Sequence, residues 1–167
     1  MDRVGSAREQ WRRERPDLDP RWDALFGRIT DAAALLTRDH LEPLFERFGL
    51  QRGEFAVLAA LRRSGAPFAL SPTTLYETTM ISSGAMTNRI DRLEADKLVE
   101  RRPDPNDRRG KLIVLTAKGR ALIDQTVMAH VENEVRLLGA ALSAKEQRTL
   151  ATLLAKLVAG LPPAKGD

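Results

Sequence analysis

The chain contains no cysteine among its 167 residues. Disulfide bonds, thiolate metal sites and cysteine-based sensing of peroxide are therefore excluded, and the composition fits the reducing interior of a cell. Aromatic residues are scarce at 5%, whereas charged residues make up 30% of the chain. This balance favours a helical architecture with much of its surface in contact with water.

Catalytic motifs are missing too. The two histidines, His40 and His130, fall on different expected helices, without partners at the spacing of a metal site or a catalytic triad. The phosphate-binding pattern Gly-x-x-x-x-Gly-Lys is absent as well. We therefore expect no enzyme, no metal site and no cofactor.

Long apolar runs are also lacking. No run approaches the ~20 apolar residues needed to cross a bilayer, and the N-terminal segment has no apolar stretch typical of a secretory signal. We therefore expect a cytoplasmic protein with no membrane partner. Apolar residues, at 43%, are enough for the core of one domain, and the net charge of +4 fits a polyanionic partner without requiring one.

Helical periodicity dominates most of the chain. Apolar residues recur every three or four positions from Pro20 to about Gly49, and Pro43 is expected to kink this helix near its end. Capping residues and proline positions mark the start of further helices. We expect these at 51–63, 71–79, 82–97, 117–138 and 143–161, with one more short helix inside 1–19.

The periodicity changes between 98 and 116. Residues 98–102 and 111–115 have the pattern of two short strands joined by a turn-rich link. A hairpin directly after a run of three short helices is the order of a winged helix-turn-helix. We predict a mainly α fold, with this winged lobe at 51–116, a two-stranded β-wing, long dimerisation helices at 20–50 and 117–161, an N-terminal extension at 1–19 and a tail at 162–167.

The helix expected at 82–97 has two distinct faces. Its apolar stripe consists of Met86, Ile90 and Leu93, and its opposite, polar face consists of Gly84, Thr87, Asn88, Asp91 and, at the edge, Arg92. Such a face fits a major groove, where Thr87, Asn88 and Arg92 would contact DNA and the capping residues Ser82 and Ser83 would meet phosphates. A face that is simply solvated would have the same residue types.

The link between the expected strands is basic. Residues 101–111 contain five basic and two acidic side chains, which gives a local charge of +3. A narrow turn carrying Arg108 and Arg109 would fit a minor groove, although a charged turn is also compatible with exposure to water alone. Its place beside the expected recognition helix favours a DNA contact.

The run SSGAMTNRIDRLEADKLVERRPDPNDRRGKLIVLTAKG resembles the MarR family of transcription regulators, and the helix order agrees from about residue 20 to 160. The resemblance implies a homodimer that binds double-stranded DNA at a pseudo-palindromic operator, with repression as the usual mode. It also implies that Asp107 braces the wing through an ion pair while Arg109 reaches the minor groove.

A narrower resemblance links the chain to the urate-responsive branch of that family. It rests on the extension with Trp11, on the RGEF motif at 52–55 and on the recognition helix. It implies that Trp11, Arg89 and Arg101 bind the effector together with an acidic residue after RGEF. That position holds Ala56, so the effector differs from urate, or the response to urate is weak, or urate is not sensed. We favour a different effector, urate-like or phenolic.

The ligand hypothesis has structural alternatives. Arg89 lies roughly 60° from Met86 around the helix. It would therefore either face a pocket that accepts an anion, or pair with Glu54 or Asp91, or extend to solvent. Trp11 would either contact a ligand or dock the N-terminal helix. We predict a sequence-specific repressor released by a small anionic or aromatic ligand; the alternative is a winged helix that binds DNA nonspecifically or binds protein, without a ligand response.

Overall fold

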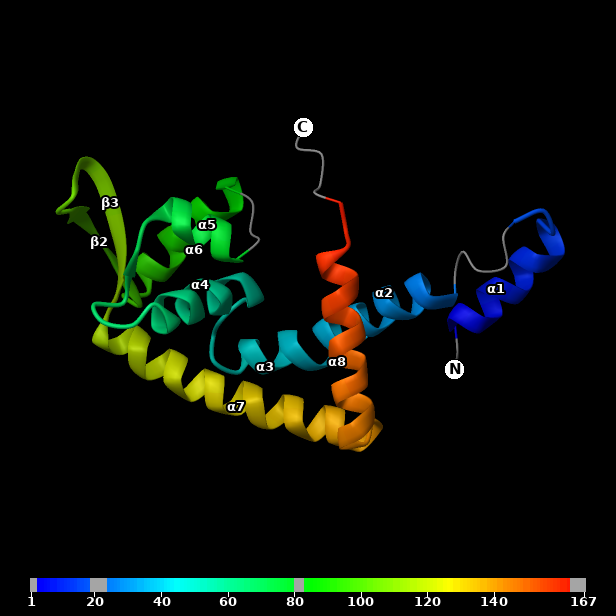
Figure 1. Ribbon diagram of the computed structural model, residues 1–167. Helices are drawn as coiled ribbons and strands as arrows, with labels where there is room; N and C mark the ends of the chain where they lie inside the picture. The colour runs from blue at the N-terminus through cyan, green and yellow to red at the C-terminus, as the bar shows by residue number, and fades with distance from the viewer. Residues whose placement is uncertain (1–2, 19–23, 80–82, 163–167) are drawn as a thin grey trace. The chain divides into compact units, whose positions relative to one another are not determined.

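The computed structural model describes residues 3–18, 24–79 and 83–162 (Figure 1). The helices are α1 (Arg3–Glu14), α2 (Ala24–Leu36), the π-helical turn η1 (Thr37–Leu41), α3 (Glu42–Glu46), α4 (Arg52–Arg63), α5 (Pro72–Thr79), α6 (Ser83–Ala95), α7 (Ala117–Ala141) and α8 (Ala144–Ala159). The strands are β1 (Ala69–Leu70), β2 (Val99–Asp104) and β3 (Asp107–Leu115). The fold is mainly helical with a winged helix-turn-helix, as the sequence predicts.

The chain divides into two compact units, residues 1–127 and 128–167, and α7 begins in the first and ends in the second. The first unit contains α1 to α6, the three strands and the start of α7. Within the described ranges, no helix is both long and apolar enough to span a membrane.

The first long helix changes its hydrogen bonding just before Pro43. Between α2 and α3, the Glu42 N–H donates to the Thr37 carbonyl, five residues back, in the π-helical turn η1. Proline has no N–H and its ring disfavours a regular turn before it, so the irregularity lies where we expected a kink. After α3, Gly49 has a φ of +71°, and Leu50 N–H donates to the Phe45 carbonyl at 3.0 Å, which ends the helix at the predicted glycine.

Capping side chains start the later helices where the sequence predicts them. The Ser71 hydroxyl accepts from the Thr74 N–H at 3.1 Å before α5, and Ser143 and Glu146 form a capping box before α8. The apolar side chains of α3 to α6, the sheet and the start of α7 form the core of the first unit. The predicted stripe of α6 is part of it, because Met86, Ile90 and Leu93 are buried.

The wing is longer than predicted and has a third strand at its base. The sheet order is β1-β3-β2, and both pairings are antiparallel. The hairpin turn is confined to Pro105 and Asn106, where the Asn106 N–H donates to the Asp104 carboxylate at 2.8 Å. The prediction of two strands missed β1, because two residues are too few to show an alternating pattern.

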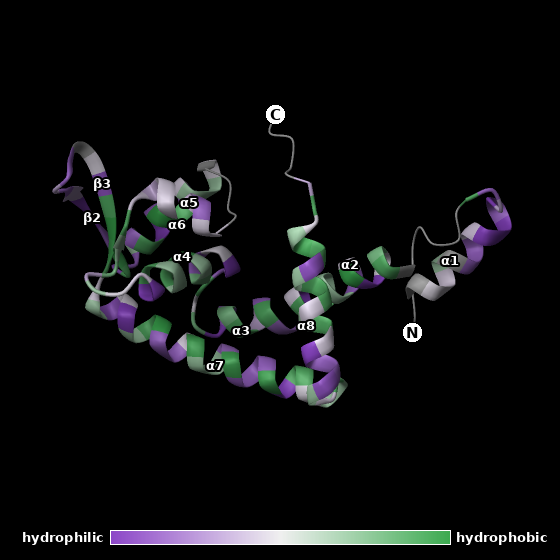
Figure 2. Cartoon of the chain, in the orientation of Figure 1, coloured by the Kyte–Doolittle hydropathy of each residue, from purple (hydrophilic) through white to green (hydrophobic). Residues whose placement is uncertain are grey.

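Several large apolar side chains are exposed along each of the helices α2, α7 and α8. Figure 2 shows apolar residues recurring along α2, α7 and α8. On α2 they include Leu25 and Phe26, and in the second unit they are Met128, Val131, Val135, Leu138, Leu150, Leu153, Leu154, Leu157, Val158 and Leu161. Exposed apolar side chains that follow one another along a helix are typical of a surface that another molecule covers.

Gly119 lets the start of α7 pack closely against the backbone of Leu98, in the loop between α6 and β2. A β-carbon at this position would lie 2.0 Å from the Leu98 carbonyl oxygen, which belongs to the backbone. We predict that Gly119→Ala lowers the free energy of unfolding by about 1–3 kcal/mol, because the backbone has to move apart. Gly139→Ala on the same helix meets open space and should instead be neutral or stabilising. Urea unfolding of both variants tests this, and equal stabilities would contradict it.

Candidate nucleic-acid interface and ligand pocket

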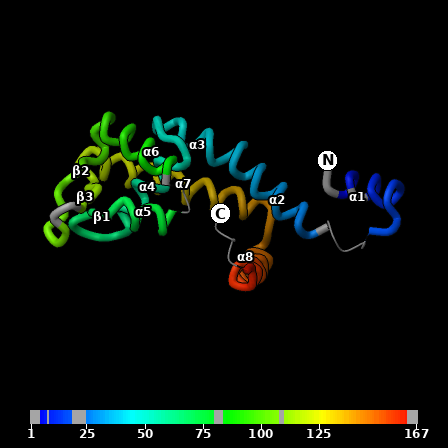
Figure 3. Tube along the Cα trace, turned by 90° about the horizontal axis from the view of Figure 1, so that it is seen from above, coloured from blue at the N-terminus to red at the C-terminus, as the bar shows by residue number. Residues whose placement is uncertain are grey.

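The polar face of α6 is exposed as predicted. Thr87, Asn88 and Asp91 are all accessible on the side of the helix opposite the buried stripe. The helix α6 packs against α4, α5 and β2. The hairpin of β2 and β3 therefore flanks α6, as the view from above also shows (Figure 3). Of the two predicted capping serines, Ser82 lies outside the described residues, and Ser83 is the first residue of α6.

The tip of the wing follows directly from the tight turn. Arg108 and Arg109 come next after Asp107 at the start of β3. The Asp107 carboxylate lies against Gly110, because a β-carbon there would be 2.9 Å from its Oδ2. Glycine at 110 therefore leaves room for the Asp107 side chain, while the ion pair expected of Asp107 remains a prediction.

Arg92 pairs with a buried carboxylate of α4. Its Nε lies 3.1 Å from Glu54 Oε1, and the Glu54 residue is only 3% exposed. The other oxygen, Oε2, accepts from the Gln51 N–H at 2.7 Å and caps α4. The Glu54 carboxylate thus caps the N-terminus of α4 and also pairs with a residue of α6. The Arg92 side chain remains 58% exposed at the edge of the proposed DNA face.

Arg101 binds two carboxylates of the recognition helix. From β2, its Nη1 donates to Glu94 and its Nη2 donates to Asp91. Its backbone N–H also donates to Glu94 Oε1 at 3.0 Å. The hydrogen bond to Asp91, with a further contribution from Glu94, raises the pKa of Arg101 above its ordinary value.

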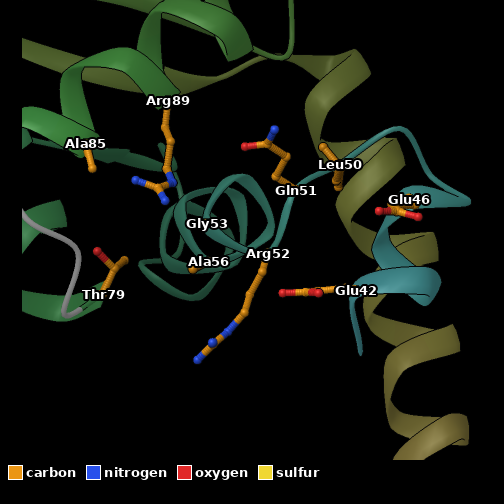
Figure 4. Close-up of a pocket in the computed structure, with 10 residues that line it drawn as sticks. All are labelled: Glu42, Glu46, Leu50, Gln51, Arg52, Gly53, Ala56, Thr79, Ala85 and Arg89. Atoms are coloured by element: carbon orange, nitrogen blue, oxygen red, sulfur yellow. The ribbon is translucent and has the colours of Figure 1, made fainter. Parts of the chain in front are cut away.

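An open pocket of about 830 Å³ lies beside the recognition helix, in the first unit (Figure 4). It is lined by residues of α3, α4, α5 and α6 and of the loop before α4: Glu42, Glu46, Leu50, Gln51, Arg52, Gly53, Ala56, Thr79, Ala85 and Arg89. Its wall combines two arginines with two glutamates and several small or apolar side chains. The wall of the pocket therefore carries positive charge, negative charge and hydrogen-bonding groups.

Arg89 is the residue of this pocket with an unmet hydrogen bond. Its Nε is buried and, among the described residues, has no acceptor. The side chain descends from α6 onto α4 at Gly53 (Figure 4), where a β-carbon would lie 1.8 Å from that Nε. Both carboxylates that could have paired with it are engaged elsewhere, Glu54 by Arg92 and Asp91 by Arg101. Arg89 therefore lines the pocket, while an anion as its partner stays a prediction.

The other residues of the expected ligand site lie elsewhere. Trp11 is on α1 with 47% of its surface exposed, and neither Trp11 nor Arg101 lines the pocket. Sequence reasoning missed Arg52, Glu42 and Glu46 as pocket residues. The spacing of the two glutamates by four places them on one helix face, and this signal was available.

The sequence pattern of the MarR family matches residues 48–110. The chain is 40% identical over 149 residues to the HTH-type transcriptional regulator PecS of Dickeya dadantii, an alignment that covers 89% of each protein. The chain belongs to the MarR family.

Solved structures of this family share the fold. A MarR variant from Escherichia coli complexed with operator DNA has 27% identity and a TM-score of 0.71, over 91% of this chain and 98% of that one. Bordetella bronchiseptica BpsR, described with regulation of its DNA binding by 6-hydroxynicotinic acid, has 30% identity and a TM-score of 0.61, over 77% and 98%.

As a member of the MarR family, the chain is a DNA-binding transcription regulator and not an enzyme, as the sequence predicts. The urate-responsive branch stays a prediction, since the names of these relatives do not decide it.

The ion pair between Glu54 and Arg92 is expected to stabilise the folded protein. We predict that Arg92→Ala lowers the free energy of unfolding by about 1–2 kcal/mol, because the buried Glu54 carboxylate loses one of its partners. The effect is limited because water screens the exposed Arg92 side of the ion pair. Arg63→Ala, on the exposed end of α4, removes the same charge and should change it by less than about 0.5 kcal/mol. Chemical unfolding compares the two, and an equal effect of both would show that the pair contributes nothing.

Proposed function

We propose that this protein is a sequence-specific repressor, released from its operator by a small anionic aromatic ligand that binds at Arg89. The observation that carries the proposal is the buried Nε of Arg89, which has no acceptor in the described part of the chain and lies at a pocket. A buried guanidinium N–H without an acceptor is costly, and a ligand carboxylate or phenolate would satisfy it.

The DNA contacts would come from α6 and the wing. Thr87 and Asn88 face outward near the N-terminal end of α6, where side chains reach base edges in a major groove. Ser82, Ser83 and Arg92 would meet the flanking phosphates. Arg108 and Arg109 directly follow the narrow turn of the hairpin and would enter the adjacent minor groove.

A homodimer on a pseudo-palindromic operator would complete this arrangement. The exposed apolar faces of α2, α7 and α8 support a second copy of the chain as their cover. Two copies present two recognition helices, which match two half-sites of DNA.

The pocket's chemistry supports an aromatic acid as the ligand. Arg89 and Arg52 supply positive charge, Leu50, Ala56 and Ala85 supply apolar contact, and Glu42 and Glu46 would accept a hydrogen bond from a ring N–H or hydroxyl group. Ala56 leaves Arg89 without a competing carboxylate. The effector named for BpsR, 6-hydroxynicotinic acid, is a compound of this class.

Ligand binding would act on DNA binding through α6 itself. Arg89 follows Asn88 directly, so any movement of its side chain toward a ligand acts on the DNA-reading turn. The first turn of α4 carries both Gly53, under Arg89, and Glu54, which holds Arg92. A ligand that draws Arg89 away from Gly53 would therefore shift α6 relative to α4.

The function is tested by mobility shifts on the upstream region of the protein's own gene and on random DNA of equal length. A sequence-specific repressor binds the former at least about 1000-fold more tightly. Equal affinity for both at moderate salt would instead indicate a nonspecific DNA-binding or protein-binding winged helix.

The wing makes a separate prediction. Arg109→Ala should weaken operator binding by about 1–3 kcal/mol and flatten the slope of log affinity against log salt by about one unit, because one phosphate contact is lost. Lys145→Ala on α8 removes the same charge far along the chain and serves as the control. Unchanged affinity of the Arg109 variant would refute the wing contact.

The pocket predicts a loss of ligand response without loss of DNA binding. Arg89→Met removes the guanidinium and should therefore abolish release by xanthine or phenolic acids. Gly139→Ala, which meets open space, should respond as the wild type does. The measurement is release of labelled operator during ligand titration. Wild-type release by Arg89→Met would show that Arg89 binds no effector.

A further inference from the structure

The face of α6 proposed to read DNA also carries two carboxylates. At about 100° per residue, Asp91 lies about 40° from Thr87 around the helix and Glu94 about 20° on the other side. Asp91 is exposed and Glu94 is half-buried. Carboxylates at this place repel the phosphates of a DNA groove, so their charge opposes the binding that the rest of the face favours.

One arginine contacts both carboxylates. Arg101 donates through Nη1 to Glu94 and through Nη2 to Asp91, so the two ends of its planar guanidinium are each engaged. Its side chain is only 32% exposed, which is less than that of Asp91 at 56% and that of Glu94 at 37%. The guanidinium is therefore directed at the helix and not at solution.

The neighbouring arginines do not share this role. Arg92, on α6 itself, pairs with Glu54, and Arg102, the next residue on β2, pairs with Glu100. The backbone of Arg101 also joins β2 to α6, because the Arg101 N–H donates to Glu94 Oε1. The link thus fixes the base of the wing to the recognition helix while it neutralises that helix.

We propose that Arg101 is a positioning residue for DNA recognition: it neutralises Asp91 and Glu94 and fixes the wing to α6, and it contacts neither the ligand nor the DNA. The inference rests on the proposed placement of α6 against DNA. It gives Arg101 a different role from the ligand contact that the sequence resemblance implies.

A double-mutant cycle on the full-length protein tests this inference. The proteins are the wild type, Arg101→Met, the pair Asp91→Asn with Glu94→Gln, and the combination of all three substitutions. Affinity for the operator is measured for each by fluorescence anisotropy at several salt concentrations. Thermal melting and circular dichroism verify that each protein is folded. Arg102→Met, alone and with the carboxylate pair, is the matched control from the same strand.

The expected result is a loss that depends on the carboxylates. Arg101→Met should weaken operator binding roughly tenfold, because two uncompensated carboxylates then face phosphates. The carboxylate pair alone should bind at least as tightly as the wild type, and the triple variant should match the carboxylate pair within about twofold. The Arg102 effect should be the same with or without the carboxylates.

Other outcomes overturn the inference. A tenfold loss that persists in the triple variant shows a direct phosphate contact by Arg101. Unchanged operator binding by Arg101→Met, with loss of ligand release, shows a ligand contact. If Arg101→Met does not fold, weaker binding by the carboxylate pair alone contradicts the inference and wild-type or tighter binding supports it. Failure of the proposed function appears separately, as equal affinity of the wild type for operator and random DNA.

Discussion

The contact between α6 and the first turn of α4 is the interaction on which the DNA-reading part of this protein depends. A buried carboxylate must be satisfied by hydrogen bonds or charge, and Glu54 is satisfied by the Gln51 N–H of its own helix and by Arg92 of α6. The same turn has no side chain at Gly53, and Arg89 fills that space. Two arginines three residues apart on α6 thus rest on consecutive residues of α4, one paired with a carboxylate and one not.

This difference between the two arginines connects the pocket with the DNA-binding face. Arg92 is held by its ion pair, while the Nε of Arg89, a pocket residue, has no acceptor among the described residues. On the opposite edge of α6, Arg101 engages Asp91 and Glu94. The recognition helix is therefore tied to α4 on one side and to the wing on the other. In our account, its orientation changes when a ligand binds Arg89.

Much of the fold follows from local rules, but the pairing of charges does not. Ser71, Ser143 and Gly49 mark helix ends through hydrogen bonds and backbone angles that depend on nearby residues, so the sequence predicts them. The strand β1 was missed because its two residues form a strand only by pairing with β3. Arg89, Arg92 and Arg101 each have an acidic residue within a few positions in the sequence. Only the packing of α4 and β2 against α6 decides which carboxylate each arginine meets. Trp11 and Arg101 do not line the pocket that Arg89 lines, and their contact with a ligand stays a prediction.

The most direct test of the central claim is the reciprocity between ligand and operator. Calorimetric titration of an aromatic acid, such as a phenolic acid, is compared for the free wild-type protein and for its operator complex. If the pocket and the DNA face are coupled through α6, the operator weakens ligand binding by the same factor as the ligand weakens operator binding. A ligand that binds the free protein and the complex with equal affinity would contradict the account.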